Sequence, residues 1–342
     1  MSASTNTTTA QAQLDVRRTA PIALGRTDYL SVLLRLIGMD LYKVRQRLLS
    51  LMLLLIATVL IGGGFLVGGA TAIRDVNLPA TSFQTYSCAQ FPHDPQCLDH
   101  PPTQADYQRA KREAVDGIAL YLNMPGAWNA QERFVIEELV ALGVILAGTL
   151  VGGEYSLGAV RLMFTRGPSR LQFLIAKLVV LAICAAPTVL FLILLGSGVG
   201  AAMAQLAGIG AGFGFLTPAV FGHFVLFALL GMLYWYSFML MATFFGVAGR
   251  STVAGIVGPL VWLLVEAPLS VFLSQAPGFA QRIPDFFLGN NLLSLLHDQE
   301  HALAIGPVGA YPVGQSLLVI AAYLIVFVGV ACWLTARRDV TQ

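Results

Sequence analysis

Three residues near the C-terminal end have the types and the spacing of a metal site. His297, Glu300 and His301 fit the pattern His-x-x-Glu-His of inverted zinc peptidases. A catalytic zinc ion needs a third protein ligand and an open coordination position. Asp339 is the one acidic residue that follows Glu300 in the sequence, and a ligand from an earlier loop stays open. We therefore expect no catalytic residues and no resident metal here but a polar loop end, with a casual metal contact or a peptidase as the alternatives.

The sequence holds no phosphate-binding loop for a nucleotide. The pattern Gly-x-x-x-x-Gly-Lys-[Ser/Thr] is absent from the whole chain. Residues 249–252 (Gly-Arg-Ser-Thr) match it in part, but they lack the lysine and the first glycine. We expect that the chain binds no cofactor and is not an enzyme by itself, and we expect no nucleic-acid partner.

A glutamate and two aromatic residues occupy long apolar segments. Glu266 stands two residues before Pro268, and an ionisable side chain inside a membrane is costly and therefore informative. It lines a substrate path or pairs with other groups inside the bundle. Trp235 and Tyr236 could stack on an amphipathic substrate, and helix packing is the alternative for both.

The elements that must position these residues are membrane-spanning helices. The chain has 342 residues, of which 56% are hydrophobic and 11% charged, against about 25% charged in an average soluble domain. The apolar residues gather in runs of about 20, the length that crosses a bilayer as a helix. This pattern predicts an all-α polytopic membrane protein with six transmembrane helices, at residues 48–69, 134–153, 173–198, 219–247, 253–273 and 316–335. Two Gly-x-x-x-Gly motifs, at 64–68 and 148–152, favour close helix packing.

The basic residues predict the orientation of these helices. They concentrate at one set of connections, and short loops rich in Lys and Arg stay in the cytoplasm. With an even number of spans, both termini are then cytoplasmic, in a multi-pass protein of the plasma (inner) membrane. The residues that carry this argument are Arg35, Lys43, Arg45, Arg47, Arg161, Arg166, Arg170, Lys177, Arg250, Arg337 and Arg338.

The chain divides into a tail, an entry helix and the membrane domain. Residues 1–25 are polar and predict a disordered cytoplasmic tail. Residues 26–47 mix apolar and charged positions at helical spacing, which predicts an amphipathic helix in the cytoplasmic interface. A cytoplasmic extension of the first span is the alternative. Residues 48–342 form the six-span transmembrane domain.

Two outer segments interrupt the six-span plan. Residues 70–132 form an extracytoplasmic cap insertion, in which Cys88 and Cys97 are expected to form a disulfide, with two free thiols as the alternative. Thr103 and Asp106 then have the spacing of a capping box that opens a helix. Before the sixth span, an apolar run at 286–296 is too short to cross a membrane and predicts a re-entrant or interfacial segment.

Residues 153–170 combine a helix end, basic residues and a turn. A span ends at Gly153, a short helical segment follows, and Gly167 and Pro168 cannot continue it. Ser169 and Gln172 have the spacing of a capping box for the third span. The pattern predicts a short, basic, cytoplasmic helix held between two spans. A purely structural turn with positive-inside charges is an equally good interpretation of these residues alone.

This segment resembles the connection between the second and third spans in permease subunits of type-2 ABC exporters. There, a Glu that ends the second span precedes a Gly-x-x-Arg helix, a Pro-Ser-Arg turn and a Lys inside the third span. The matching positions are Glu154, Gly158, Arg161, Pro168, Ser169, Arg170 and Lys177. The resemblance covers residues 26–339, from the entry helix through six spans. The 70–132 insertion is a departure, because many polysaccharide-exporting members lack it.

The resemblance implies a transport subunit that works with a separate ATPase. The segment that includes Tyr155 and Arg166 is expected to be a coupling helix docked in a groove of an ABC ATPase subunit, present in two copies. ATP and Mg²⁺ would bind to that partner. A second permease subunit, identical or paralogous, would complete the pathway in the lipid bilayer. An ion-driven secondary transporter or a channel is the alternative, and a membrane enzyme is a third.

Overall fold

The computed structural model describes residues 26–80, 103–156, 169–210 and 217–337. In these residues the protein is all-helical, with no strand. Six helices are long and apolar enough to span a membrane, which confirms the prediction of an all-α multi-pass membrane protein. They are α3 (Leu48–Asn77), the continuous helix Ala127–Ser156, α10 (Arg170–Leu206), α11 (Pro218–Gly249), α12 (Thr252–Ser274) and α14 (Val313–Arg337).

The second span changes its helical pitch along its length. It consists of α7 (Ala127–Gln131), a π-helical turn η2 (Glu132–Glu138) and α8 (Val140–Ser156). The Leu139 N–H donates to the Phe134 carbonyl across this turn, at 3.1 Å. A π-turn rotates the side chains that follow it relative to those that precede it, and such turns are common at functional sites. Glu132, at the start of this turn, has a buried side chain.

Side-chain caps start several helices where the sequence predicts them. The Ser169 hydroxyl accepts from the Gln172 N–H, and the Gln172 side chain accepts from the Ser169 N–H. This is the predicted capping box of the third span. Thr103 and Asp106 form the second predicted box, which opens α6 (Gln104–Leu122). Both boxes satisfy backbone donors that the first helical turn leaves without partners.

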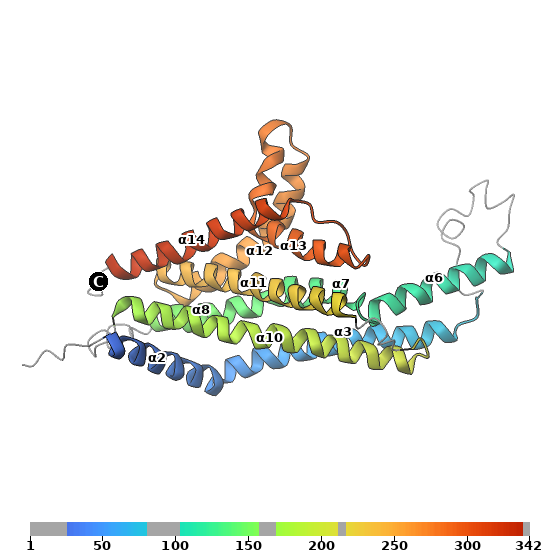
Figure 1. The fold of residues 1–342 in the computed structure, drawn as a ribbon, viewed down its shortest axis with the longest axis horizontal. Helices are drawn as coiled ribbons and strands as arrows, with labels where there is room; N and C mark the ends of the chain where they lie inside the picture. Colours follow the sequence, from blue (N-terminus) through green and yellow to red (C-terminus); the bar gives the residue numbers. More distant parts are fainter. Residues whose placement is uncertain (1–25, 81–102, 157–168, 211–216, 338–342) are drawn as a thin grey trace, which may run out of the picture.

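The spans extend beyond the predicted apolar cores. With 37 residues, α10 is about 55 Å long at 1.5 Å per residue, against about 30 Å of hydrocarbon. The helix α6 packs on the C-terminal half of α3, where Tyr121 stacks on Phe65 with ring centroids 5.5 Å apart. The Lys111 Nζ donates to the Leu78 carbonyl at 2.7 Å. Figure 1 shows α6 continuing past the bundle, and α6 packs on both α3 and α10.

The backbones of the second and fifth spans approach each other closely at glycines. A Cβ added at Gly152 would lie 2.6 Å from the Ser251 carbonyl oxygen, and one at Gly148 would lie 2.9 Å from the Gly255 carbonyl carbon. This confirms that the motif at 148–152 permits close approach. The motif at 64–68 differs at its first position, because a Cβ at Gly64 would meet nothing within 4 Å. Only Gly68 has a close neighbour in that motif, the Tyr121 ring at 2.7 Å.

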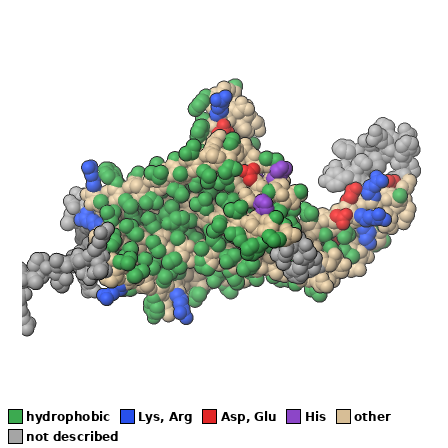
Figure 2. All heavy atoms as spheres, in the orientation of Figure 1, with side chains coloured by type: hydrophobic (Ala, Val, Ile, Leu, Met, Phe, Trp, Pro, Cys, Tyr) green, Lys and Arg blue, Asp and Glu red, His purple; other side chains and the backbone are tan. Residues whose placement is uncertain are grey.

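Two further helices and a projecting hairpin complete the bundle. Before the first span, α2 (Arg26–Gln46) lies along α10. After α12, the short helix η3 (Gly278–Phe286) folds back, and it stands out from the bundle together with the end of α12 in Figure 1. The apolar run before the sixth span belongs to α13 (Leu288–Ala302), which packs on α11 and α14. Figure 2 shows hydrophobic side chains covering the flank of the bundle, with Lys and Arg mainly toward its ends.

Candidate functional site

A cluster of four charged side chains joins three helices at one end of the bundle. Lys177 of α10 is fully buried, and its Nζ lies 2.8 Å from Glu154 Oε1 and 2.9 Å from Asp40 Oδ1. Lys43 of α2 contacts the same two oxygens at 3.2 Å each. Two ammonium groups therefore alternate with two carboxylates, one from α8 and one from α2. We name these four residues the charge cluster.

The electrostatics of the charge cluster are balanced. Burial opposes the charge on Lys43, but the carboxylates of Glu154 and Asp40 outweigh it, so the pKa of Lys43 is raised. The ammonium group of Lys177 also lies 5.3 Å from the centroid of the Phe173 ring, within cation–π range. A buried charge is costly to desolvate and tolerable only with its partners in place. The positions of α2, α8 and α10 are thus interdependent at this end of the bundle.

Further hydrogen bonds join the end of α8 and the start of α10 to neighbouring helices. The Gln172 Nε2 donates to the Tyr29 carbonyl of α2 at 3.3 Å, and an Arg170 Nη1 donates to the Ala336 carbonyl of α14, also at 3.3 Å. The hydroxyls of Ser156 and Thr252 lie 2.8 Å apart and join the end of α8 to the start of α12. The last residues of α8 and the first of α10 therefore contact α2, α12 and α14.

The structure places half of the predicted coupling residues at this end. Glu154 is buried in the charge cluster, Tyr155 packs against the core, and Ser169 and Arg170 open α10. The prediction of a coupling helix itself falls on residues 157–168, so Gly158, Arg161, Arg166 and Pro168 lie outside the described residues. Sequence reasoning counted Lys43 among the basic residues that predict the orientation and did not pair it with Asp40 of the same helix. Their spacing of three residues, with opposite charges, was the available signal.

Glu266 accepts hydrogen bonds from the start of α13 and forms no ion pair with a described residue. Its Oε1 accepts from the backbone N–H of Gly289 at 2.6 Å and from that of Asn290 at 3.4 Å. These amides belong to the first turn of a helix, where a carboxylate is stabilised by free donors and the helix dipole. A Cβ at Gly289 would lie 3.0 Å from both carboxylate oxygens, so a small residue is needed there. Of the two alternatives for Glu266, pairing inside the bundle has this direct geometric support.

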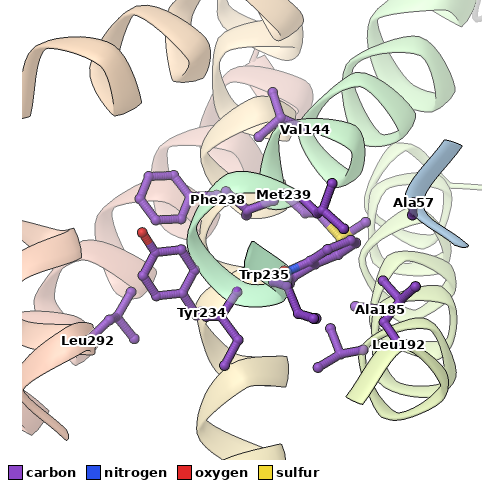
Figure 3. Packing of buried hydrophobic residues seen from close by; sticks show 14 of the residues in the cluster. Ala57, Val144, Ala185, Leu192, Tyr234, Trp235, Phe238, Met239 and Leu292 are labelled. Atoms are coloured by element: carbon purple, nitrogen blue, oxygen red, sulfur yellow. The ribbon is translucent and has the colours of Figure 1, made fainter. Parts of the chain in front are cut away.

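Trp235 and Tyr236 do not join Glu266. The indole N–H of Trp235 donates to the Val135 carbonyl of η2 at 2.9 Å, and the Tyr236 hydroxyl donates to the Leu178 carbonyl at 3.3 Å. Figure 3 shows Trp235 on the side of α11 that faces α3 and α10, opposite to Tyr234. Trp235 lines an apolar cavity of about 290 Å³ between α3, α8, α10 and α11. The role of both residues in a substrate path stays a prediction.

A second group of ionisable side chains surrounds the start of the second span. The His297 Nε2 lies 3.3 Å from Glu132 Oε1, and the Asn129 amide donates to Glu300 Oε2 at 3.1 Å. Burial, followed by the nearby Glu132 carboxylate, raises the pKa of Glu300 from 4.5 to about 8. The hydrogen bond with Glu132, despite the opposing effect of burial, raises the pKa of His297. Sequence reasoning treated His297 and Glu300 as a loop end and missed their buried partner in η2.

The remaining predicted residues divide between described and undescribed parts of the chain. Within the residues that the structure describes, no group of three or more His, Cys, Asp or Glu side chains is arranged to hold a metal ion. Cys88 and Cys97 lie outside the described residues, so their disulfide stays a prediction. Cys184 and Cys332 are free.

Comparison with known proteins assigns a family to two thirds of the chain. A family model described as "Protein of unknown function (DUF2705)" matches residues 119–341. This range contains five of the six spans, Glu154 and Lys177 of the charge cluster, and Glu266. A comparison with curated proteins gave no match.

Proposed function

We propose that this chain, which belongs to the DUF2705 family, is the membrane-spanning permease subunit of an ATP-driven ABC exporter. It forms the substrate pathway and couples to a separate ATPase subunit. The proposal rests on the resemblance of residues 153–177 to the coupling segment of type-2 ABC permeases, within a six-span protein.

The single observation that supports it best is the position of the charge cluster. Glu154 and Lys177 stand on either side of the segment 157–168, and they share contacts with Asp40 and Lys43 of α2. A force applied to this segment would therefore act on α8, α10 and α2 together. The contact between Ser156 and Thr252 adds α12 to the elements that would move.

The mechanism is coupling through a two-state element. ATP-driven closure of two ATPase subunits pushes on a coupling helix at residues 155–166. The spans then shift between arrangements with different access to the substrate pathway. ATP and Mg²⁺ bind to the ATPase subunits, and this chain pairs with a second permease subunit, identical or paralogous.

The placement in the membrane follows from the same proposal. Both termini, the charge cluster and the segment 157–168 lie on the cytoplasmic side of the plasma membrane. The helix α2 lies in the cytoplasmic interface, with Leu30 and Leu34 exposed toward lipid. On the outer side, α6 belongs to the cap, and α13 is a re-entrant or interfacial helix that rests on Glu266.

Copurification from the native membrane tests the proposal. We expect an ATPase with a phosphate-binding loop to accompany the solubilised protein, and transport by the complex to stop with vanadate. Absence of any ATPase, together with transport that survives vanadate and stops with a protonophore, would contradict the proposal.

The alternative, an ion-driven carrier or a channel, is favoured by one observation. Glu132 and Glu300 are buried carboxyl groups close to each other at the outer end of the second span. Ionisable residues inside membrane proteins often belong to proton or ion pathways. On this alternative, Glu300→Gln would abolish transport that depends on the proton gradient. On our proposal, the same variant would leave vanadate-sensitive transport in place.

A further inference from the structure

A cavity at the outer half of the bundle has a composition that differs from its apolar surroundings. It measures about 400 Å³ and lies between η2, α8, α11, α12 and α13. Its apolar wall comes largely from leucines, among them Leu260, Leu263 and Leu293. Glu137 and Glu138 of η2 also line it. Binding sites for small molecules typically combine such an apolar wall with a few placed polar groups.

The two carboxylates of η2 that line the cavity are not used to hold the fold. Neither Glu137 nor Glu138 makes a hydrogen bond or an ion pair with a described residue. Among the described residues, the basic side chains that interact electrostatically with Glu137 are His297 and Arg133. His297 is already paired with Glu132, and Arg133 has an exposed side chain. The cavity therefore presents two carboxyl groups without a cationic partner of their own beside an apolar wall.

Tyr234 adds a polar group that lacks a partner. Its side chain is 3% exposed, and it lines the cavity from α11. Its ring contacts Phe238, with centroids 5.0 Å apart, but its hydroxyl has no hydrogen bond to any described residue. The hydroxyl is therefore free to donate a hydrogen bond to, or accept one from, a molecule in the cavity. The ring face can also attract a cation.

We propose that this cavity binds an amphipathic organic cation, a protonated amine on an apolar body. The amine is placed between Glu137, Glu138 and the Tyr234 hydroxyl, and the apolar body lies against the leucines of α12 and α13. Glu266 lines the same cavity, and its Oε1 already accepts from the first amides of α13. That such a cation is the cargo of an exporter rests on the proposed function. That the cavity binds it does not.

Fluorescence titration of the purified protein in phosphatidylcholine nanodiscs tests the site. The probe is dansylcadaverine, which carries a primary ammonium, and its matched control is dansyl aminohexanoate, which carries a carboxylate on a similar body. We expect saturable binding of the cation and none of the anion. Equal binding of both probes would overturn the proposal, because apolar partition alone would then explain the signal.

Conservative variants locate the probe. The double variant Glu137→Gln, Glu138→Gln keeps the shape of both side chains, and we expect it to lower the affinity for dansylcadaverine at least about tenfold, since each charge-assisted hydrogen bond carries that order of affinity. Tyr234→Phe should lower it a few fold. The control is Glu113→Gln, which removes an exposed acid from α6. Unchanged affinity in the double variant would overturn the assignment.

The same assay separates two sources of the amine. Competition by phosphatidylethanolamine in the discs would assign the site to a membrane aminolipid, and unchanged binding in its presence would assign it to a soluble amphipathic amine. Copurification of an ATPase is read independently. Cation-specific binding without a copurified ATPase would support this site and contradict the exporter proposal. A copurified ATPase without cation-specific binding would support the exporter proposal and contradict this site.

Discussion

At the scale of single residues, Lys177 is the side chain on which most of the charge cluster depends. It is fully buried, and it contacts both carboxylates at shorter distances than Lys43 does. The sequence indicated one of its two carboxylate partners. Glu154 and Lys177 were singled out together by resemblance, but the contribution of Asp40 depends on how α2 packs on α10, which no local pattern encodes.

Lys177→Met should destabilise the protein by about 3 kcal/mol, because it leaves two buried carboxylates with one half-exposed lysine. The double variant Lys177→Met, Glu154→Gln retains the pair of Lys43 and Asp40, so it should be less destabilised than the sum of its single variants. Thermal unfolding in one detergent measures both. Lys177→Met combined with Glu113→Gln should be additive, and additivity in the first pair as well would contradict the network.

The pH dependence of stability should come in part from Glu300. Its pKa in the folded protein is about 8 against 4.5 ordinarily, so the folded state binds this proton more tightly. The stability that this provides is full below pH 4.5 and is lost as the pH rises to about 8. The raised pKa of His297 acts in the same direction, above pH 6.5.

Glu300→Gln should therefore flatten the fall in melting temperature between pH 5 and 8 that the wild-type protein shows, roughly the window set by its two pKa values. The remaining slope would come from His297. His301→Gln, which changes an exposed side chain of the same helix, serves as the control and should leave the profile unchanged. A profile for Glu300→Gln identical to wild type would refute the assignment.

At the scale of elements, local signals predicted helix starts better than helix ends. The capping boxes at Thr103 and Ser169 involve residues three apart, so they can be recognised in the sequence. The far ends of α3 and α10 could not be predicted from hydropathy, because they continue as helix beyond the apolar run and are stabilised by packing with α6. The π-turn η2 also has no local signal that we recognise.

Gly152→Ala should destabilise the protein by about 1–3 kcal/mol, because the new methyl group would meet the backbone of Ser251 and Thr252 at the start of α12. Gly63→Ala is the matched control, since a Cβ there meets nothing within 4 Å. We expect that variant to be neutral, or more stable by up to about 1 kcal/mol from helix propensity. Equal melting temperatures for both variants would contradict the close approach of α8 and α12.

At the scale of the whole molecule, hydropathy predicted six spans, and the structure has six candidate helices at those positions. Residue types could not predict which spans are neighbours. The packing of α8 against both α11 and α12, and the projection of the end of α12 with η3, arise from tertiary contacts. For the same reason the sequence indicated Glu266 as notable, but it did not predict that Glu137, Glu138 and Tyr234 line one cavity with it.

Site-specific photocrosslinking at position 161 tests the central claim, that this chain transmits force from an ATPase, most directly. With a photoreactive amino acid in place of Arg161 in native membranes, we predict a crosslinked partner that carries a Gly-x-x-x-x-Gly-Lys-[Ser/Thr] loop. The same substitution at the exposed Arg282 of η3 should give no such partner. Membranes in which position 161 crosslinks to lipid or to another copy of this chain, and never to an ATPase, would contradict the account.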